Sequence, residues 1–195
     1  MARGLVVSSL LLWIVVLFNL LMTLALIRHR NAAPPTPGRE VLKVGQSAPG
    51  FTAETLNGEE VTLSTYAGRA VAFLFIGTHC SPCRTAIPTY EALRPKAMRA
   101  GVELILVSID DVARTQAFAE ELHVTLPVLV APHTSNPFMD DYKGTGTPFY
   151  CLVDAQSKVQ STGYPSPDWG EWKTLSESWA DEEIHEARFV LAGGR

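Results

Sequence analysis

Cysteine is scarce in this sequence of 195 residues, which contains three cysteines and no second pair beyond Cys80 and Cys83. A structural zinc site takes four ligands, typically from two cysteine pairs or from a cysteine pair with closely spaced histidines. The third cysteine, Cys151, stands alone, and His123 and His133 lack a recognised ligand spacing. We therefore predict no metal site, and we interpret Cys151 as a buried, unreactive thiol in an apolar strand.

Basic side chains are few once the N-terminal segment is set aside. Residues 1–30 contain Arg3, Arg28 and Arg30 and no acidic residue, so 13 basic and 20 acidic side chains remain in residues 31–195, a formal charge of −7. A domain this acidic is poorly suited to nucleic acid or to lying flat on anionic lipid. We expect no nucleic-acid partner.

Charge is absent from residues 5–27, an apolar run of 23 residues that is long enough to cross a hydrocarbon core of ~30 Å as a helix. A cleaved signal peptide has a shorter apolar region and ends at small residues, whereas this run ends at the basic residues 28–30. We predict an uncleaved transmembrane anchor in the lipid bilayer. Its flanking charges lean slightly toward a cytoplasmic domain and do not settle the orientation.

Composition divides the chain into four segments. Residues 1–30 form the anchor, and residues 31–42 form a linker whose prolines make it a semi-rigid spacer. A globular domain is expected at residues 43–167. The last segment, residues 168–195, is expected to form a closing helix, predicted at 169–189, and a loose tail.

Hydrophobic periodicity predicts an α/β domain. Residues 70–77 and 102–110 are continuous apolar runs, typical of strands buried on both faces of a sheet. Residues 82–100 between them favour a helix with a kink at Pro88, which makes a strand-helix-strand unit and a partly parallel sheet. Four further elements are expected: a helix at 111–122, a short strand at 125–131, and a hairpin of strands at 149–154 and 158–163.

The pair Cys80 and Cys83 lies where the first predicted strand passes into its helix. Free N–H groups and the helix dipole at that end stabilise an anion, which lowers the pKa of a thiol such as Cys80 and favours an attacking thiolate. Cys83 is one helical turn later and is expected to be more buried, as a resolving thiol. Pro82 falls in the first turn, where proline is well tolerated.

Together with these residues, the chain from about residue 43 to 163 resembles the thioredoxin superfamily. Within it, the likeness is to the membrane-anchored bacterial thiol-disulfide oxidoreductases of the TlpA, ResA and MauD type. Four features carry the resemblance: residues 44–69, the Cys80-Ser81-Pro82-Cys83 motif, Pro88, and Thr147-Pro148 ahead of a strand. It implies a thioredoxin-like fold, a central mixed sheet flanked by helices, and an enzyme whose only redox group is the Cys80–Cys83 disulfide, with no bound cofactor.

The resemblance also implies how substrate is bound. Pro148 should be cis and lie against the dithiol, while the backbone of Thr147 pairs with an extended substrate segment. Pro82 and His79 complete the expected substrate-binding residues. His79 stands where the family usually has an aromatic residue; a protonated His79 could stabilise the Cys80 thiolate, but we favour an exposed loop residue.

Two carboxylates of related proteins are missing here. Leu74 occupies the position of the thioredoxin aspartate, and Ala86 that of a ResA-type glutamate. The group that accepts the proton of the Cys83 thiol therefore stays unidentified, unless it is water.

Two other functions share this fold or these ligands. Two thiolates could bind Cu(I) in a delivery module, although the related copper proteins space their cysteines CxxxC. A thiol peroxidase would need the pattern PxxxTxxC, but Thr78 stands two residues before Cys80 instead of three. Haem attachment is excluded, because Arg84 follows the second cysteine where a histidine is required.

Location and partners follow from the chemistry and the resemblance. Disulfides persist in oxidising compartments, and long folded domains cross a membrane largely regardless of flanking charge. We expect a single-pass protein of the cytoplasmic membrane with its domain on the periplasmic side. Its substrates should be thiols or disulfides of exported proteins, as in cytochrome c biogenesis or amine-dehydrogenase maturation, and a membrane protein should donate its electrons.

Overall fold

The computed structural model describes residues 12–13, 15–22, 41–166 and 170–179. Residues 1–40 and Val41–Arg195 form two separate compact units. Most of the predicted anchor at 5–27, and all of the linker except residues 41–42, lie outside the described residues. Within the described part of the chain, no helix combines the length and the apolar character that crossing a membrane requires.

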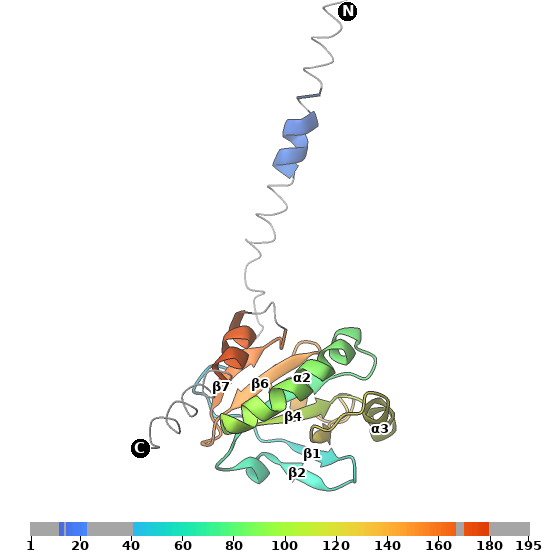
Figure 1. Cartoon of the computed structure of the whole chain (residues 1–195), viewed down its shortest axis with the longest axis vertical. Coiled ribbons are helices and arrows are strands. Elements are labelled where there is room, and N and C mark those ends of the chain that lie inside the picture. Colours follow the sequence, from blue (N-terminus) through green and yellow to red (C-terminus); the bar gives the residue numbers. More distant parts are fainter. Residues whose placement is uncertain (1–11, 14, 23–40, 167–169, 180–195) are drawn as a thin grey trace, which may run out of the picture. The chain divides into compact units, whose positions relative to one another are not determined.

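A mixed seven-stranded sheet forms the centre of the described domain, as predicted (Figure 1). Its spatial order is β2-β1-β5-β4-β3-β6-β7, in which β3, β4 and β5 are parallel and the other pairs are antiparallel. The strands are β1 (Thr52–Thr55), β2 (Glu60–Thr62), β3 (Ala70–Ile76), β4 (Val102–Ser108), β5 (Val128–Val130), β6 (Phe149–Val153) and β7 (Val159–Gly163).

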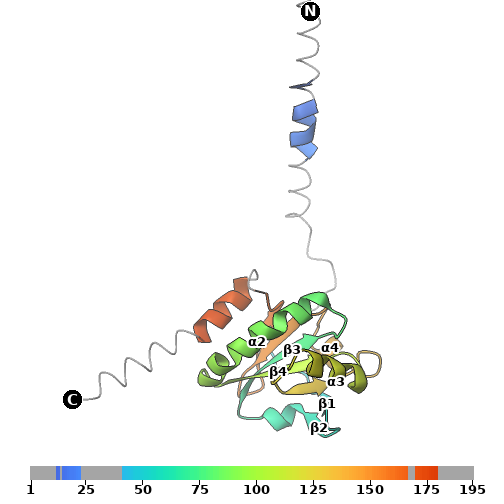
Figure 2. The same ribbon diagram turned by 45° about the vertical axis from the view of Figure 1, so that its right-hand side comes forward.

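Helices cover both faces of this sheet. Their bounds are η1 (Leu63–Tyr66), α2 (Ser81–Arg99), α3 (Val112–Glu121) and α4 (Phe138–Asp141), and residues 170–179 are also helical. One hydrophobic cluster joins a sheet face to α2, α3 and residues 170–179, and a second joins the other face to η1 and α4. Figure 2 shows α2 lying across β3 and β4.

The parallel pair β3 and β4 places two loops side by side. Both strands are continuous apolar runs, and the side chains of β3 from Val71 to Ile76 are at most 1% exposed. Ile76 pairs with Ser108 at the carboxyl ends of the two strands. Loops that leave the carboxyl ends of parallel strands share one edge of the sheet. The chain after Ile76 therefore meets the chain after Ser108.

The helix α2 starts where the sequence predicts. Cys80 is its N-cap and Pro82 lies in its first turn. The helix continues through Pro88, the predicted kink site, and through a second internal proline, Pro95. Each proline lacks the N–H that would bond one turn back. Neither interruption ends the helix.

The helix of residues 170–179 packs onto the same face as α2. Trp172 is 1% exposed, and its ring centroid lies 6.1 Å from that of Tyr90 on α2 and 4.8 Å from that of Tyr150 on β6. Trp179 is buried beside Trp172. Both tryptophans are therefore part of the hydrophobic core of the domain. Trp169 and the rest of the predicted helix at 169–189 lie outside the described residues.

Candidate active site

The two cysteines of the motif are joined by a disulfide. Their Cα atoms lie 5.2 Å apart, and the bond links the N-cap residue of α2 to its first turn. Cys83 has no exposed surface, whereas Cys80 is partly exposed. This difference fits the expected division between an accessible attacking sulfur and a shielded resolving sulfur.

The start of α2 is built to hold negative charge on Cys80. The backbone N–H of Cys83 points at the Cys80 Sγ over 3.2 Å, which makes the sulfur itself the helix cap. In the reduced protein this N–H and the helix dipole act on a thiolate. The geometry therefore favours the charged, nucleophilic form of Cys80.

The bond between Thr147 and Pro148 is cis, as the resemblance implied. The Thr147 carbonyl oxygen lies 3.4 Å from the Cys80 Sγ. In the disulfide the sulfur carries no proton, so this contact becomes a hydrogen bond only when Cys80 is a thiol. Pro148 has no N–H to offer a substrate, and it lines a groove together with Ser81 and Pro82 at the start of α2.

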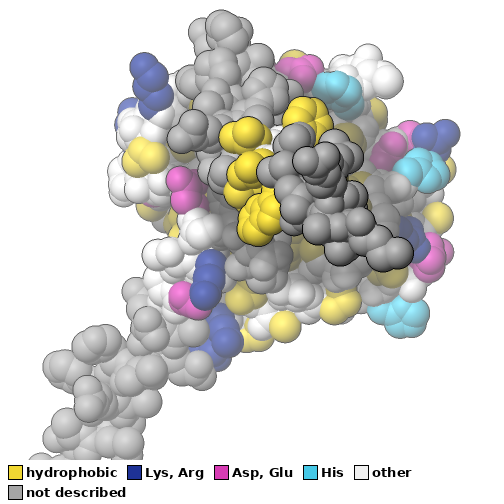
Figure 3. Space-filling view, turned by 90° about the horizontal axis from the view of Figure 1, so that it is seen from above, with side chains coloured by type: hydrophobic (Ala, Val, Ile, Leu, Met, Phe, Trp, Pro, Cys, Tyr) yellow, Lys and Arg dark blue, Asp and Glu magenta, His cyan; other side chains and the backbone are white. Residues whose placement is uncertain are grey.

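An uncharged groove of about 430 Å³ runs beside the dithiol. Its lining includes Ser81 and Pro82 from the start of α2, Tyr90 further along, Pro148, and Pro165 in the segment after β7. Each described lining residue is apolar or carries a neutral polar group. An extended peptide with small or apolar side chains matches this surface. In the view of Figure 3, hydrophobic side chains gather near the centre and charged ones lie toward the margins.

His79 is exposed in the loop before Cys80, in agreement with the interpretation that we favoured. Leu74 is fully buried in β3, and Ala86 is a groove residue of α2. Neither position supplies a carboxylate to the dithiol.

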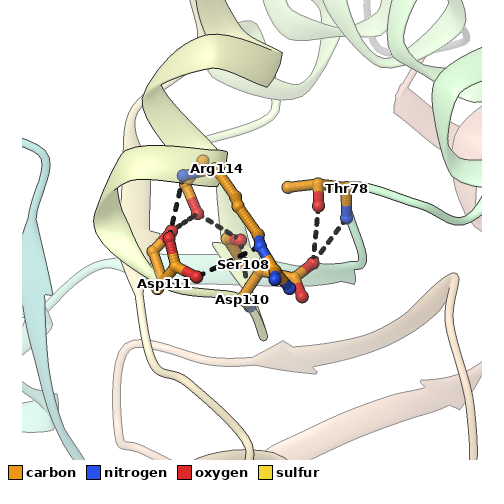
Figure 4. A network of polar contacts seen from close by, with 6 residues as sticks. Thr78, Ser108, Asp110, Asp111 and Arg114 are labelled. Atoms are coloured by element: carbon orange, nitrogen blue, oxygen red, sulfur yellow. Dashed lines mark hydrogen bonds and ion pairs between the residues drawn. The ribbon is translucent and has the colours of Figure 1, made fainter.

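A different carboxylate, which sequence reasoning missed, lies at this loop. Asp110 Oδ2 accepts hydrogen bonds from the Thr78 backbone N–H (2.7 Å) and from the Thr78 hydroxyl (2.9 Å), as Figure 4 shows. Thr78 is two residues before Cys80. Asp110 follows β4, so the meeting of parallel strand ends was the signal that could have identified it.

Arg84, directly after Cys83, ties the same loop to α3. Its guanidinium donates to the Thr78 carbonyl oxygen over 3.4 Å, is paired with Glu121 and lies 5.4 Å from the ring centroid of Phe118. The loop before Cys80 is thus held from two sides, by Asp110 and by Arg84.

Cys151 is fully buried in β6, where it pairs in register with Phe73. Burial raises its pKa to about 12, because the thiolate would lose its hydration. The interpretation of Cys151 as an unreactive thiol agrees with this. Among the described residues, no group of three or more histidine, cysteine or acidic side chains is arranged to hold a metal ion.

A strand that leads to a CxxC disulfide at a helix start, with the residue before a cis-proline in contact with the first sulfur, defines a thioredoxin-like dithiol enzyme. Comparison with known families agrees. The AhpC/TSA family model matches residues 44–162, more than half of the chain, and the chain belongs to this family. Within it, the chain is a thiol-disulfide oxidoreductase of the ResA type.

Two curated relatives show this likeness. The thiol-disulfide oxidoreductase ResA of Bacillus subtilis is 31% identical over 124 residues, which cover 63% of this chain and 68% of that protein. ResA of Geobacillus thermodenitrificans is 29% identical over 142 residues, covering 72% of this chain and 80% of that protein.

Solved structures show the same fold. The thioredoxin domain of a thiol-disulfide oxidoreductase from Bacteroides vulgatus superposes with a TM-score of 0.60 at 23% identity, covering 70% of this chain and 97% of that one. A protein described as the thiol:disulfide interchange protein DsbE from Chlorobium tepidum gives 0.61 at 24%, covering 71% and 98%. At these identities the likeness concerns the fold alone.

Proposed function

We propose that this oxidoreductase works in the reducing direction, on disulfides of exported proteins, from an anchor in the cytoplasmic membrane. The observation that carries the exchange reaction is the asymmetry of the dithiol, and the reducing direction is part of the proposal that the potential tests. Cys80 is partly exposed, capped by a backbone N–H and bordered by an uncharged groove, while Cys83 is buried behind it. A folded or extended substrate therefore reaches one sulfur only.

The reaction has two exchange steps. The Cys80 thiolate attacks one sulfur of the substrate disulfide, forms a mixed disulfide and releases the other sulfur as a thiolate. Cys83 loses its proton, attacks Cys80 and frees the second substrate sulfur, so that two electrons pass to the substrate and the Cys80–Cys83 bond forms. A dithiol protein in the membrane then returns two electrons by the same exchange.

Membrane attachment and sidedness are supported by sequence and chemistry. The uncharged run at 5–27 has the length of a bilayer-spanning helix, and the domain after it is acidic. Disulfide substrates accumulate outside the cytoplasm. We therefore propose that the domain lies on the periplasmic side of the membrane.

The proposed substrates are cysteine-containing proteins that mature after export, either apocytochrome c or a disulfide-rich dehydrogenase subunit. The resemblance to proteins of the TlpA, ResA and MauD type supports this choice, and so does a groove that accepts uncharged side chains beside Cys80. No contact among the described residues favours copper delivery or peroxidase activity.

A trapping experiment on the full-length chain tests this function. Cys83→Ser cannot resolve the mixed disulfide, so exported substrates should stay attached to Cys80 and be recovered with it from the membrane fraction. Cys80→Ser is the negative control, and Cys151→Ala should behave as wild type. Partners confined to the cytoplasm, or a Cys80 thiol that a membrane-impermeant reagent cannot reach in cells with a permeabilised outer envelope, would contradict the proposal.

A further inference from the structure

Asp110 is the acidic side chain that holds the loop delivering Cys80. Its Oδ2 accepts two hydrogen bonds from Thr78, and both donors belong to a residue that is 7% exposed. Ser108, the last residue of β4, supports the aspartate, since the Asp110 N–H points at its hydroxyl over 3.3 Å. Figure 4 shows one carboxylate oxygen of Asp110 aimed at Thr78.

Gly77 shows how near this carboxylate is to the dithiol. A methyl group on Gly77 would stand 3.8 Å from Asp110 Oδ2, 3.6 Å from the Cys80 Cβ and 3.3 Å from the Thr147 Oγ1. The carboxylate, the attacking cysteine and the residue before the cis-proline therefore surround one glycine. Asp110 Oδ2 and Cys80 Cβ thus both lie within 4 Å of the position that a Cβ of residue 77 would occupy.

We propose that Asp110 is a positioning residue that also makes the dithiol a stronger reductant. The disulfide is neutral, whereas the reduced enzyme carries a thiolate on Cys80. A partly buried carboxylate repels that thiolate, because charges in such a site are poorly screened by salt. The negative charge of Asp110 thus penalises the reduced form alone and shifts the equilibrium toward the disulfide.

The other charged groups around the loop do not cancel the repulsion between the Asp110 carboxylate and the Cys80 thiolate. Arg84 is the cation that contacts the loop, and it is shared with Glu121. Arg114 of α3 is paired with Asp111, the neighbouring carboxylate, which caps α3 instead of the loop. His79 is exposed. Asp110 is the carboxylate bonded to the loop, so its charge acts at the shortest range.

Asp110→Asn tests the charge separately from the hydrogen bonds, because the amide oxygen still accepts from Thr78. The full-length oxidised chain is equilibrated with glutathione. Two glutathione thiols supply two electrons and become one glutathione disulfide; of the two protons that they lose, one goes to Cys83 and the other to solvent, so that Cys80 is left as thiolate. We expect the equilibrium to move about tenfold toward the dithiol, equivalent to about 30 mV, and the measured pKa of Cys80 to fall.

Matched variants decide between a charge effect and a structural one. Asp111→Asn removes a neighbouring charge and should leave the equilibrium within twofold of wild type. Asp110→Ser, a smaller uncharged replacement, should shift it in the same direction as Asp110→Asn. The role of Asp110 alone is overturned if Asp110→Asn leaves both the redox equilibrium and the pKa of Cys80 at the wild-type values. It is likewise overturned if Asp111→Asn shifts the redox equilibrium as much as Asp110→Asn does. A wild-type chain without a reversible disulfide overturns the redox function and this role together.

Discussion

The Sγ of Cys80 and the carbonyl oxygen of Thr147 lie 3.4 Å apart, although the two residues are 67 positions apart in the sequence. The sheet explains the contact. Cys80 follows β3 and Thr147 precedes β6. These two strands pair antiparallel, and Phe75 near the end of β3 lies opposite Phe149 at the start of β6. The end of one strand and the start of the other therefore meet at a single edge, where the dithiol and the substrate-binding backbone come together.

The unequal roles of the cysteines predict different mutant behaviour. Cys80→Ser should lower the reduction of a model protein disulfide to the uncatalysed rate, because no exposed thiolate remains. Cys83→Ser should form the mixed disulfide at a near-normal rate and then stop. Single-turnover kinetics with a chromogenic disulfide measures both steps. A Cys83→Ser variant that attacks no faster than Cys80→Ser would reverse our assignment of the two sulfurs.

We expect any side chain at position 77 to lower the disulfide-reducing activity. A Cβ there would stand 3.3 Å from the Thr147 Oγ1, so Gly77→Ala must displace the Thr147 side chain by a few tenths of an ångström. We expect a loss of about 1 kcal/mol in the free energy of unfolding and slower disulfide reduction. Gly50→Ala is the control, because a Cβ at Gly50 meets no atom within 4 Å. Equal rates for the two variants would contradict the crowding.

Trp172 should be a main stabiliser of the described domain. It is 1% exposed and packs against Tyr90 and Tyr150, so Trp172→Ala should lower the free energy of unfolding by about 3–5 kcal/mol. Met98→Ala, at a side chain that is 60% exposed, should change it by less than about 0.5 kcal/mol. Urea unfolding of the full-length chain measures both. A small Trp172 effect would show that residues 170–179 dock only weakly.

The raised pKa of Cys151 predicts that the free energy of unfolding falls in alkaline solution. Its pKa is raised from 9.0 to about 12, so above pH 9 the unfolded chain loses this proton while the folded chain keeps it. The stabilisation is complete below pH 9 and falls by about 1.4 kcal/mol per pH unit until pH 12. In the oxidised protein the other two cysteines do not titrate. Cys151→Ala should flatten the stability curve between pH 9 and 10, where tyrosines contribute least; an unchanged slope would refute this account.

Residue patterns predicted the central strands and the dithiol because their signals are local. The apolar runs that became β3 and β4 have no polar face, and a cysteine at a strand-to-helix junction is placed at the helix start by the chain itself. The hairpin of β6 and β7 was likewise marked by two β-rich runs around a short turn.

Local sequence patterns do not specify which atoms of distant segments come into contact, even where they indicate that two strand ends meet. The bond from Thr78 to Asp110 depends on the register of β3 with β4, which no local pattern specifies. The cis bond before Pro148 came from the family resemblance, because an isolated X–Pro bond favours trans. The burial of Trp172 against two tyrosines likewise depends on where residues 170–179 dock on the sheet.

The reduction potential of the Cys80–Cys83 pair in the full-length chain tests the central claim most directly. Equilibration with glutathione or dithiothreitol buffers should show a reversible two-electron couple. We predict a potential nearer to the about −270 mV of reducing thioredoxins than to the about −120 mV of strongly oxidising dithiol proteins. A value at the oxidising end would contradict the proposed direction of electron flow, and the absence of a reversible couple would contradict the redox function itself.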